Sequence, residues 1–448
     1  MCPWKSRSNA CKSNITWCLL RRQQCRLSYE EQRTILQYGV CQTTRTRRAV
    51  SCKFPGSPVS TYFLAFSPDG ETVASSHGDH FVRISEVKSA RCLHILKGHP
   101  RSVWCLVFHP SNPHLLASGC LKGVVNVWDL TQGDGKLVGS LSCQNVTSLA
   151  FHPTDMVLLI ATGNQLLFWS WRQKEPFAMV ESATDDEKIR LVRFDLLGHH
   201  ILTGILDVEQ PNDVSMDKIP SANEKPSTSR TVVHINMQNM EATVDNVTDE
   251  VIAEHSTTRV AMSESQSTCL FRLQWWDFTH LEIPNLKQTN MHIVARNCLL
   301  TNNTSADISS DGRRLSALVV KLDDGTKLCN VCVFSLEKYN LGQCLYSTTL
   351  GRNTFSTCFS PLGTHIIVGI ACDNRFALFQ EHPVDRTVAY IFKLCTNFSA
   401  EVVTLNVRAS DEWRFSDLRA NAVIWHPIIG YGLIAFGTNK GGVYFCHV

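Results

Sequence analysis

The sequence predicts an all-β fold, a seven-bladed β-propeller in which four-stranded sheets repeat around a ring. Three observations predict it. A strand of alternating apolar residues, ending in an aromatic residue and a turn, recurs along the 448-residue chain. Its first copies are spaced by 42, 43 and 43 residues, the period of a propeller blade. Further strand patterns follow each copy, and a sheet with two apolar faces needs a neighbour on each side.

Each copy is anchored by the residue that precedes its turn. The seven anchors are Phe66, Phe108, Phe151, Phe194, Ile308, Phe359 and Trp425. A second strand follows each anchor, and a third strand often ends near an aromatic residue, as VVNVWDL (124–130) does. In the sixth copy the expected third strand is FALFQ (376–380), and residues 395–421 are interpreted as an excess over the repeat.

The last copy reaches its third strand at Val448, so its fourth strand has to come from another part of the chain. The segment AVSCKF (49–54), before the first copy, has a strand pattern. Pairing it with the last copy would remove two open sheet edges at once. We therefore expect residues 49–54 to close the ring.

The second copy contains most of a hydrogen-bonded tetrad typical of WD repeats. Three of its members are matched by His99, Ser118 and Trp128, and Trp128-Asp129 is the pair that gives the repeat its name. The fourth member is an Asp in the turn before the third strand, where this chain has Lys122. We expect the charge-assisted bond to the histidine to be lost. The other copies are expected to lack the tetrad altogether.

The residue types that usually make an active site do not converge in the sequence. The nineteen Cys are spread over the chain and mostly lie in alternating strands, as small buried side chains in a reducing compartment do. The close pair Cys329 and Cys332 has no second pair to complete a zinc site. The seventeen His are scattered, and acids such as Asp69 lie in turns. We expect no enzyme activity, no metal and no cofactor.

The charge of the chain is divided unevenly. Residues 1–53 hold eleven Lys and Arg against two Glu, a balance of +9 in a chain whose net charge is +3. This asymmetry indicates a separate basic segment, residues 1–48. It has no aromatic platform or nucleic-acid motif, so we expect no nucleic-acid partner. No run of 18 apolar residues exists, so no transmembrane segment is expected.

The basic segment has two helix patterns. Ser28-Tyr-Glu-Glu31 is a capping box that opens a helix running to about Gly39. One face and the flank of a shorter helix before it hold Ile15, Trp17, Leu19, Leu20 and Arg22. Two interpretations stay open. The helical pair packs against the ring, or its basic and apolar face binds in a cavity of another protein.

A long interruption separates the fourth and fifth anchors. Residues 207–268 contain eleven acidic and four basic residues with many Ser, Thr, Asn and Pro. This composition predicts a disordered insertion in the fourth blade between the propeller halves 49–206 and 269–448. It is either a solvated tether or a docking and phosphorylation tether.

The excess before the last copy contains one short motif. Phe415 and Leu418 form an aromatic-x-x-aliphatic pattern close to Asp411 and Glu412. Such patterns can add a strand to ubiquitin-like modifiers of autophagy. Because they also occur often by chance, a modifier-binding motif is one of two interpretations.

Several of these stretches together resemble the Ambra family, WD-repeat regulators of autophagy and ubiquitin ligation. The resemblance rests on STYFLAFSPDGETVASSH, GHPRSVWCLVFHP, LLASGCLKGVVNVWDL, VTSLAFHPTDMVLLIAT, EPFAMV and KIRLVRFDLLGHHILT. After the interruption it rests on FRLQWWDF, SADISSDGRRLSA, YNLGQCLYST and AFGTNKGG. The stretches lie within residues 15–206 and 270–448.

The resemblance implies a non-catalytic scaffold and substrate receptor of a cullin-4 RING ubiquitin ligase, which binds the triple-propeller adaptor of that ligase and protein substrates. It implies roles in autophagy initiation through Beclin and its lipid kinase, and in turnover of cyclin-type proteins. The alternative is a ligase-independent autophagy scaffold that binds Beclin or ubiquitin-like modifiers. The expected location is the cytoplasm, with the autophagosome and nucleus as further sites. The adaptor-binding residues carried over are Ile15, Trp17, Leu19, Leu20, Arg22 and Leu27.

The sequence also departs from the family. The family's insertion is hundreds of residues long and holds docking motifs, whereas residues 207–268 are about 62. The Trp-Asp-x-Arg motif of other receptors is absent, since Trp128-Asp129 continues with Leu-Thr. The resemblance therefore supports a receptor function, which needs only the ring and the helices, more strongly than autophagy functions that reside in a long insertion.

Overall fold

The computed structural model describes residues 49–131, 133–207, 269–302, 304–323, 326–350, 354–371, 386–394, 400–407 and 419–447. The described residues belong to one compact unit. Predictions for residues 1–48, for most of the insertion and for 408–418 therefore lie outside the described residues.

The described residues form strands and turns and contain no helix. There are five separate four-stranded sheets and one eight-stranded sheet. The larger sheet consists of two four-stranded sets joined by one residue pair, Cys298 with Val319. No helix of the described part is long and apolar enough to cross a membrane. The prediction of an all-β propeller is confirmed.

We number the four-stranded sets as blades in chain order. Blade 1 consists of β2 (Thr61–Phe66), β3 (Thr72–His77), β4 (Val82–Glu86) and β5 (Cys92–Leu96). Blade 2 consists of β6 (Val103–His109), β7 (Asn112–Cys120), β8 (Val124–Asp129) and β9 (Lys136–Ser142). Blade 3 consists of β10 (Val146–Phe151), β11 (Leu158–Thr162), β12 (Gln165–Trp169) and β13 (Ala178–Glu181). Blades 4 and 5 consist of β14 (Ile189–Phe194), β15 (His200–Leu206), β16 (Phe271–Asp277) and β17 (Ile293–Cys298); and β18 (Ala306–Ile308), β19 (Arg314–Asp323), β20 (Thr326–Ser335) and β21 (Cys344–Leu350). Blades 6 and 7 consist of β22 (Thr354–Phe359), β23 (His365–Ile370), β24 (Arg386–Leu394) and β25 (Ala400–Val407); and β26 (Ala420–Trp425), β27 (Leu433–Thr438), β28 (Val443–His447) and β1 (Ala49–Ser51).

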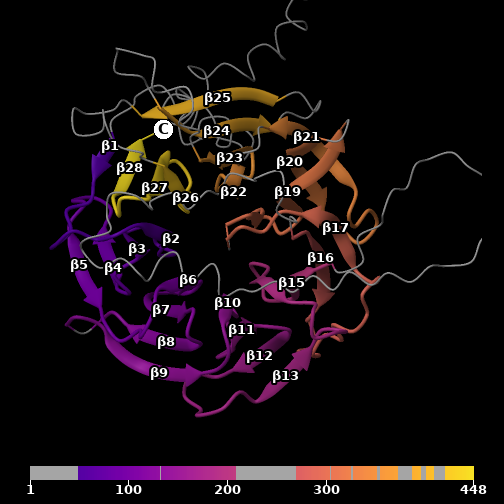
Figure 1. Ribbon diagram of the computed structural model, residues 1–448, viewed down its shortest axis with the longest axis horizontal. Coiled ribbons are helices and arrows are strands. Elements are labelled where there is room, and N and C mark those ends of the chain that lie inside the picture. Colours follow the sequence, from indigo (N-terminus) through magenta and orange to yellow (C-terminus); the bar gives the residue numbers. More distant parts are fainter. Residues whose placement is uncertain are drawn as a thin grey trace, which may run out of the picture. The chain divides into compact units, whose positions relative to one another are not determined.

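Within this unit the blades follow one another around a central axis. The strands β2, β6, β10, β22 and β26 lie near the axis, and β5, β9 and β13 lie at the periphery (Figure 1). Buried hydrophobic side chains fill the space between consecutive blades, including the space between blade 7 and blade 1. The core is therefore a series of layers between blades, as expected when each sheet needs a neighbour on both faces.

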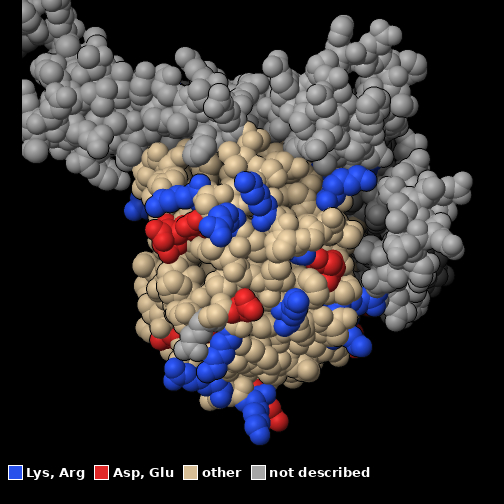
Figure 2. Space-filling view, turned by 90° about the vertical axis from the view of Figure 1, so that its left-hand side faces the viewer, with Lys and Arg blue, Asp and Glu red and all other residues tan. Residues whose placement is uncertain are grey.

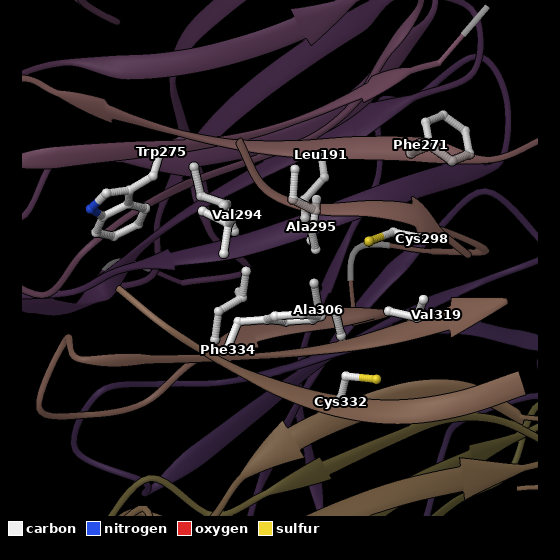
Figure 3. Close-up of a cluster of buried hydrophobic side chains, with 14 of the residues drawn as sticks. Leu191, Phe271, Trp275, Val294, Ala295, Cys298, Ala306, Val319, Cys332 and Phe334 are labelled. Atoms are coloured by element: carbon white, nitrogen blue, oxygen red, sulfur yellow. The ribbon is translucent and has the colours of Figure 1, made fainter. Parts of the chain in front are cut away.

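The layer between blades 4 and 5 shows how the residues of two sheets meet. Leu191, Trp275 and Val294 come from blade 4, and Ala306 and Phe334 come from blade 5 (Figure 3). All of them are at most 9% exposed. This packing continues across the position where the chain is interrupted, so blade 4 is as complete as the uninterrupted blades.

The ring closes as predicted, between the two ends of the described chain. The strand β1 pairs antiparallel with β28, with Ala49 opposite Cys446 and Ser51 opposite Tyr444. The backbone N–H of Cys52 donates to the Val443 carbonyl at 2.8 Å. Cys52 is 6% exposed and packs in the layer between blades 7 and 1. The ring is therefore closed both by the backbone pairing of β1 and by the buried side chain of Cys52.

The prediction for the sixth blade was wrong in its outer half. Its third strand is β24, Arg386–Leu394, and not residues 376–380, which lie outside the described residues. Its fourth strand is β25, Ala400–Val407, inside the stretch interpreted as an excess. Residues 389–393 of β24 pair with β23 on one side, and the strand pairs from Arg386 to Leu394 with β25 on the other, with a bulge between Thr387 and Ala389. This segment has a pairing partner on both sides, so it forms the third strand of the blade.

Candidate functional site

The residues of the predicted tetrad do meet in blade 2. The Trp128 indole Nε1–H donates to the Ser118 hydroxyl at 2.8 Å. The Ser118 hydroxyl and His99 Nε2 share a hydrogen bond of 2.6 Å. His99 Nδ1 is buried without a hydrogen-bond partner. In the usual repeat an Asp accepts a hydrogen bond from this histidine, and Lys122 takes the place of that Asp. Burial lowers the pKa of His99 to about 4. These hydrogen bonds stabilise the fold of blade 2.

Asp129 has a turn-forming role in the structure. Its Oδ1 accepts hydrogen bonds from the Thr131 backbone N–H at 2.9 Å and the Thr131 hydroxyl at 2.7 Å. These bonds hold the pKa of Asp129 below its usual range. Asp69 accepts the Ser67 hydroxyl in a similar turn at 2.6 Å. Asp69 lies in a turn, as the sequence predicted, whereas Asp129 is the last residue of β8 and bonds the turn that follows it.

Part of the tetrad also occurs in blade 4, which corrects the expectation that the other copies lack it. The Trp276 indole Nε1–H donates to the Thr203 hydroxyl at 2.9 Å. Thr203 takes the place of Ser118, since either hydroxyl can accept this bond. The next residue, Asp277, accepts the Thr279 backbone N–H at 2.9 Å, as Asp129 accepts that of Thr131.

The predicted adaptor-binding residues Ile15, Trp17, Leu19, Leu20, Arg22 and Leu27 lie outside the described residues, and so do Phe415 and Leu418. The structure brings together another set of residues, which the sequence analysis missed. Six innermost strands contain a bulge at their second residue. The residues at these bulges are Tyr62, Trp104, Thr147, Arg190, Phe355 and Asn421. Each of them lies four residues before a predicted anchor.

A bulge re-aims one side chain out of the regular alternation. At one end of the axis three of these side chains, those of Tyr62, Trp104 and Arg190, contact one another across blades. The rings of Tyr62 and Trp104 lie 5.9 Å apart. The Arg190 guanidinium lies over the Trp104 ring at 5.6 Å, within range of a cation–π interaction. Arg190 also donates to the carbonyls of Thr147 at 3.2 Å and Thr301 at 2.7 Å.

The contacts continue through blades 5 and 7 and return to blade 1. The Asn302 amide, next to Thr301, donates to the Asn421 carbonyl at 3.4 Å. The Asn421 amide donates to the Ser60 hydroxyl at 3.2 Å and the Thr61 carbonyl at 3.1 Å, beside Tyr62. We call this circuit the axial collar. Its members are Tyr62, Trp104, Arg190, Thr301, Asn302 and Asn421.

Arg190 is the only member of the axial collar with a formal charge. Burial lowers its pKa to about 10, so it remains a cation at neutral pH. The ion pairs found among the described residues involve side chains other than Arg190, such as Arg193 with Asp307 at 3.0 Å and Arg272 with Glu187 at 2.8 Å. Within the described part of the chain, therefore, Arg190 has carbonyl and aromatic partners but no carboxylate.

The described residues contain no group of three or more His, Cys, Asp or Glu side chains that could bind a metal. Burial raises the pKa of several thiols, that of Cys332 to about 11 and that of Cys52 to about 12. A thiol with a raised pKa is a poor nucleophile. The arrangement is therefore suited to binding: an aromatic pair and one cation at the end of the axis.

The outer surface has charges of both signs. On the side where β5 lies, Lys and Arg side chains are separated by Asp, Glu and uncharged residues (Figure 2). The structure thus shows no continuous basic surface on this face.

Comparison with known proteins gives the same fold and one clear resemblance. Residues 50–84 and 90–129 match the family "WD domain, G-beta repeat". The chain is 48% identical over 192 residues to "Activating molecule in BECN1-regulated autophagy protein 1A" of Danio rerio, and 47% identical over 195 residues to protein 1B of the same organism. These matches cover 41% and 42% of this chain and 14% of each relative. The resemblance to the Ambra family is confirmed over this stretch.

More distant matches support the fold alone. "Periodic tryptophan protein 2 homolog" of Schizosaccharomyces pombe is 31% identical over 124 residues, 27% of this chain and 14% of that protein. The β-propeller domain of Cps50 (Swd1) from Myceliophteria thermophila matches with a TM-score of 0.55 and 13% identity, covering 90% of this chain and 100% of that one.

Proposed function

We propose that this WD-repeat propeller, which resembles the Ambra family over 192 residues, is a non-catalytic scaffold that brings proteins together in autophagy. The observation that carries the proposal is the 48% identity to a relative named for BECN1-regulated autophagy. The absence of a metal-binding group from the described residues is consistent with a scaffold. Since the match spans 14% of that relative, the role of the whole relative comes to this chain as a proposal.

The finer proposal is that the chain is a substrate receptor of a cullin-4 RING ubiquitin ligase. On this proposal residues 1–48 bind the triple-propeller adaptor of the ligase, and the ring presents a protein substrate. Its support is the amphipathic pattern of residues 15–38 together with the resemblance. The alternative is a scaffold that binds Beclin or a ubiquitin-like modifier without the ligase, through residues such as Phe415 and Leu418.

Affinity purification followed by mass spectrometry tests both the scaffold proposal and the finer proposal of a ligase receptor. The full chain is compared with a chain lacking residues 1–40 and with a Leu19→Asp, Leu20→Asp variant. A Gln23→Asp, Gln24→Asp variant is the matched control, because it adds the same charge to the polar positions that follow. We expect the adaptor to co-purify with the full chain and the control, and to be lost from the other two.

The outcomes separate the two levels of the proposal. Equal recovery of the adaptor from all four chains would contradict the receptor role of residues 1–40. Recovery of Beclin without the adaptor would support the ligase-independent scaffold, and Phe415→Ala then tests the contact. If no protein partner is enriched over an unrelated WD-repeat propeller, the scaffold proposal itself is wrong.

A further inference from the structure

We propose that the axial collar is a binding site for an acidic segment of a partner protein, and that Arg190 is the residue that meets its carboxylate. The inference rests on the proposed scaffold function and specifies the chemistry of one of its partners. Three observations support it: an uncompensated cation, an arginine donor without a partner and an accessible aromatic pair.

The first observation is the charge of Arg190. Its partners are the carbonyls of Thr147 and Thr301 and the ring of Trp104. A partly buried cation without a counter-ion is costly, because it loses hydration that carbonyls replace only in part. A carboxylate brought by a partner would supply the opposite charge and form a charge-assisted hydrogen bond. The lowered pKa of Arg190 has the same cause, its burial.

The second observation is an arginine donor without a partner, close in the sequence to the axial collar. The Asn302 and Asn421 amides donate to acceptors within the protein. Arg419 lies two residues before Asn421, and its buried Nε has no hydrogen-bond partner. An acceptor, such as a carboxylate, can satisfy spare donors, whereas a second cation cannot. The site therefore favours an anionic ligand.

The third observation is the aromatic surface beside the charge. Tyr62 and Trp104 are both partly exposed, with their rings 5.9 Å apart. Protein-binding sites concentrate their energy in Trp, Tyr and Arg, and the axial collar has one of each. The partner segment we infer has an acidic residue next to an apolar one, so that both parts of the site are used.

The opposite end of the sheets provides a contrast. There the turns that follow the innermost strands are bonded to each other. His152 Nε2 bonds the Gly198 carbonyl at 3.1 Å, and His426 Nε2 bonds the Gly70 carbonyl at 2.9 Å. The exposed side chains of this end include the apolar Leu196 and Ile429, and its exposed Arg313 is already paired with Glu337 at 3.2 Å. Because the cation without a carboxylate partner lies at the axial collar, we place the acidic ligand at that end of the axis.

The experiment measures binding of a fluorescein-labelled peptide to the full chain by fluorescence anisotropy. The peptide has about twelve residues, alternates Glu with Ser and carries one central Leu, a length typical of peptides bound by domains. A peptide with Gln in place of Glu has the same shape without charge. Arg190→Gln removes the cation and keeps an amide donor. Arg172→Gln, at an exposed position in the turn after β12, removes the same charge elsewhere.

We expect the Glu peptide to bind and the Gln peptide not to bind. Arg190→Gln should weaken binding of the Glu peptide about tenfold or more, the effect of losing one charge-assisted bond. Arg172→Gln should leave it unchanged, and added salt should weaken binding to the wild type. Equal weakening by both variants would indicate non-specific attraction and overturn the proposal, as would absence of binding to the wild type.

A second measurement covers the case in which Arg190→Gln fails to fold. A benzophenone group placed at the central position of the Glu peptide is cross-linked to the wild-type chain, and the modified peptides are identified by mass spectrometry. Cross-links to residues 60–62, 104 and 301–302 support the axial collar, and cross-links confined to other residues overturn it. Recovery of partner proteins without peptide binding would contradict this inference and leave the scaffold function intact.

Discussion

The imidazole of His99 is buried, and only one of its two nitrogens has a partner. Nε2 bonds Ser118 at 2.6 Å, whereas Nδ1 has none. The repeat normally provides an Asp at the position of Lys122. We expect Lys122→Asp to raise the free energy of unfolding by about 1.5–3 kcal/mol, the usual value of one hydrogen bond to a charged group. Urea unfolding measures the change.

Two variants isolate the cause of that gain. Lys122→Asn removes the lysine without adding charge and should gain less than Lys122→Asp. In a His99→Gln background, Lys122→Asp should gain nothing, because its partner is gone. The same gain in both backgrounds would mean that the new Asp acts elsewhere.

Three buried histidines make stability depend on pH. Burial lowers the pKa of His77 to about 3, with help from the Arg83 charge, and that of His99 and His365 to about 4. Each is neutral in the folded state and binds a proton when unfolded below its usual pKa of about 6.5. Stability is therefore complete above about pH 6.5 and falls as the pH drops toward 4. Between pH 7.5 and 5.5 each histidine should cost about 1.4 kcal/mol.

The comparison of His99→Gln with the wild type measures one of these contributions. The loss of unfolding free energy between the two pH values should be smaller in the variant by about 1.4 kcal/mol. His280→Gln changes a residue exposed to solvent and should leave the loss unchanged. An identical pH dependence in all three proteins would show that His99 is protonated without unfolding.

At the scale of one element, the closing strand β1 depends on the residue that follows it. The side chains of Ala49 to Ser51 are exposed, whereas Cys52 is 6% exposed in the layer between blades 7 and 1. We expect Cys52→Asp to cost several kcal/mol, since it buries a charge without a partner. Val50→Asp, at a side chain 48% exposed, should change stability by about 0.5 kcal/mol or less. Urea unfolding compares the two.

Deletion of residues 49–54 extends this test. It exposes the edge of β28, so we expect the protein to aggregate. A soluble deletion variant with the unfolding midpoint of the wild type would show that closure by β1 is dispensable.

The elements differed in how well the sequence predicted them. Each anchor and its turn repeat the same local chemistry, so the inner strands followed from the pattern. The outer strands of blade 6 did not, because residues 376–380 and 386–394 both alternate and only sheet pairing selects β24. The axial collar was missed for another reason. Its bulged positions hold a different residue type in each blade, so the shared signal is the position four residues before the anchor.

For the whole molecule, the interruption in blade 4 leaves the sheet intact. All seven residues of β15 pair with β16, from His200 opposite Asp277 to Leu206 opposite Phe271. Beyond the pairing, the Asp207 backbone N–H donates to the Leu270 carbonyl at 2.9 Å. Asp207 also pairs with Arg296 at 2.6 Å. The two ends of the insertion therefore meet as an ordinary hairpin.

We accordingly expect replacement of residues 208–268 by a short Gly-Ser linker to change the unfolding free energy by about 1 kcal/mol or less, since loop closure depends only weakly on length. Arg272→Leu serves as the control. It leaves Glu187 buried without its ion-pair partner, 2.8 Å away in the wild type, and should cost about 3–5 kcal/mol. A large loss from the linker variant would mean that the insertion contributes to the stability of the ring.

The pairing of β1 with β28 also determines how the ring responds to mechanical force. Because the strands are antiparallel and Ala49 lies opposite Cys446, a pull applied at residues 49 and 447 acts on neighbouring ends of the same ladder. The hydrogen bonds are then loaded one after another, as in a zipper, and not all at once in shear. In single-molecule stretching the ring should therefore open at low force at its seam, with blades 1 to 6 still folded.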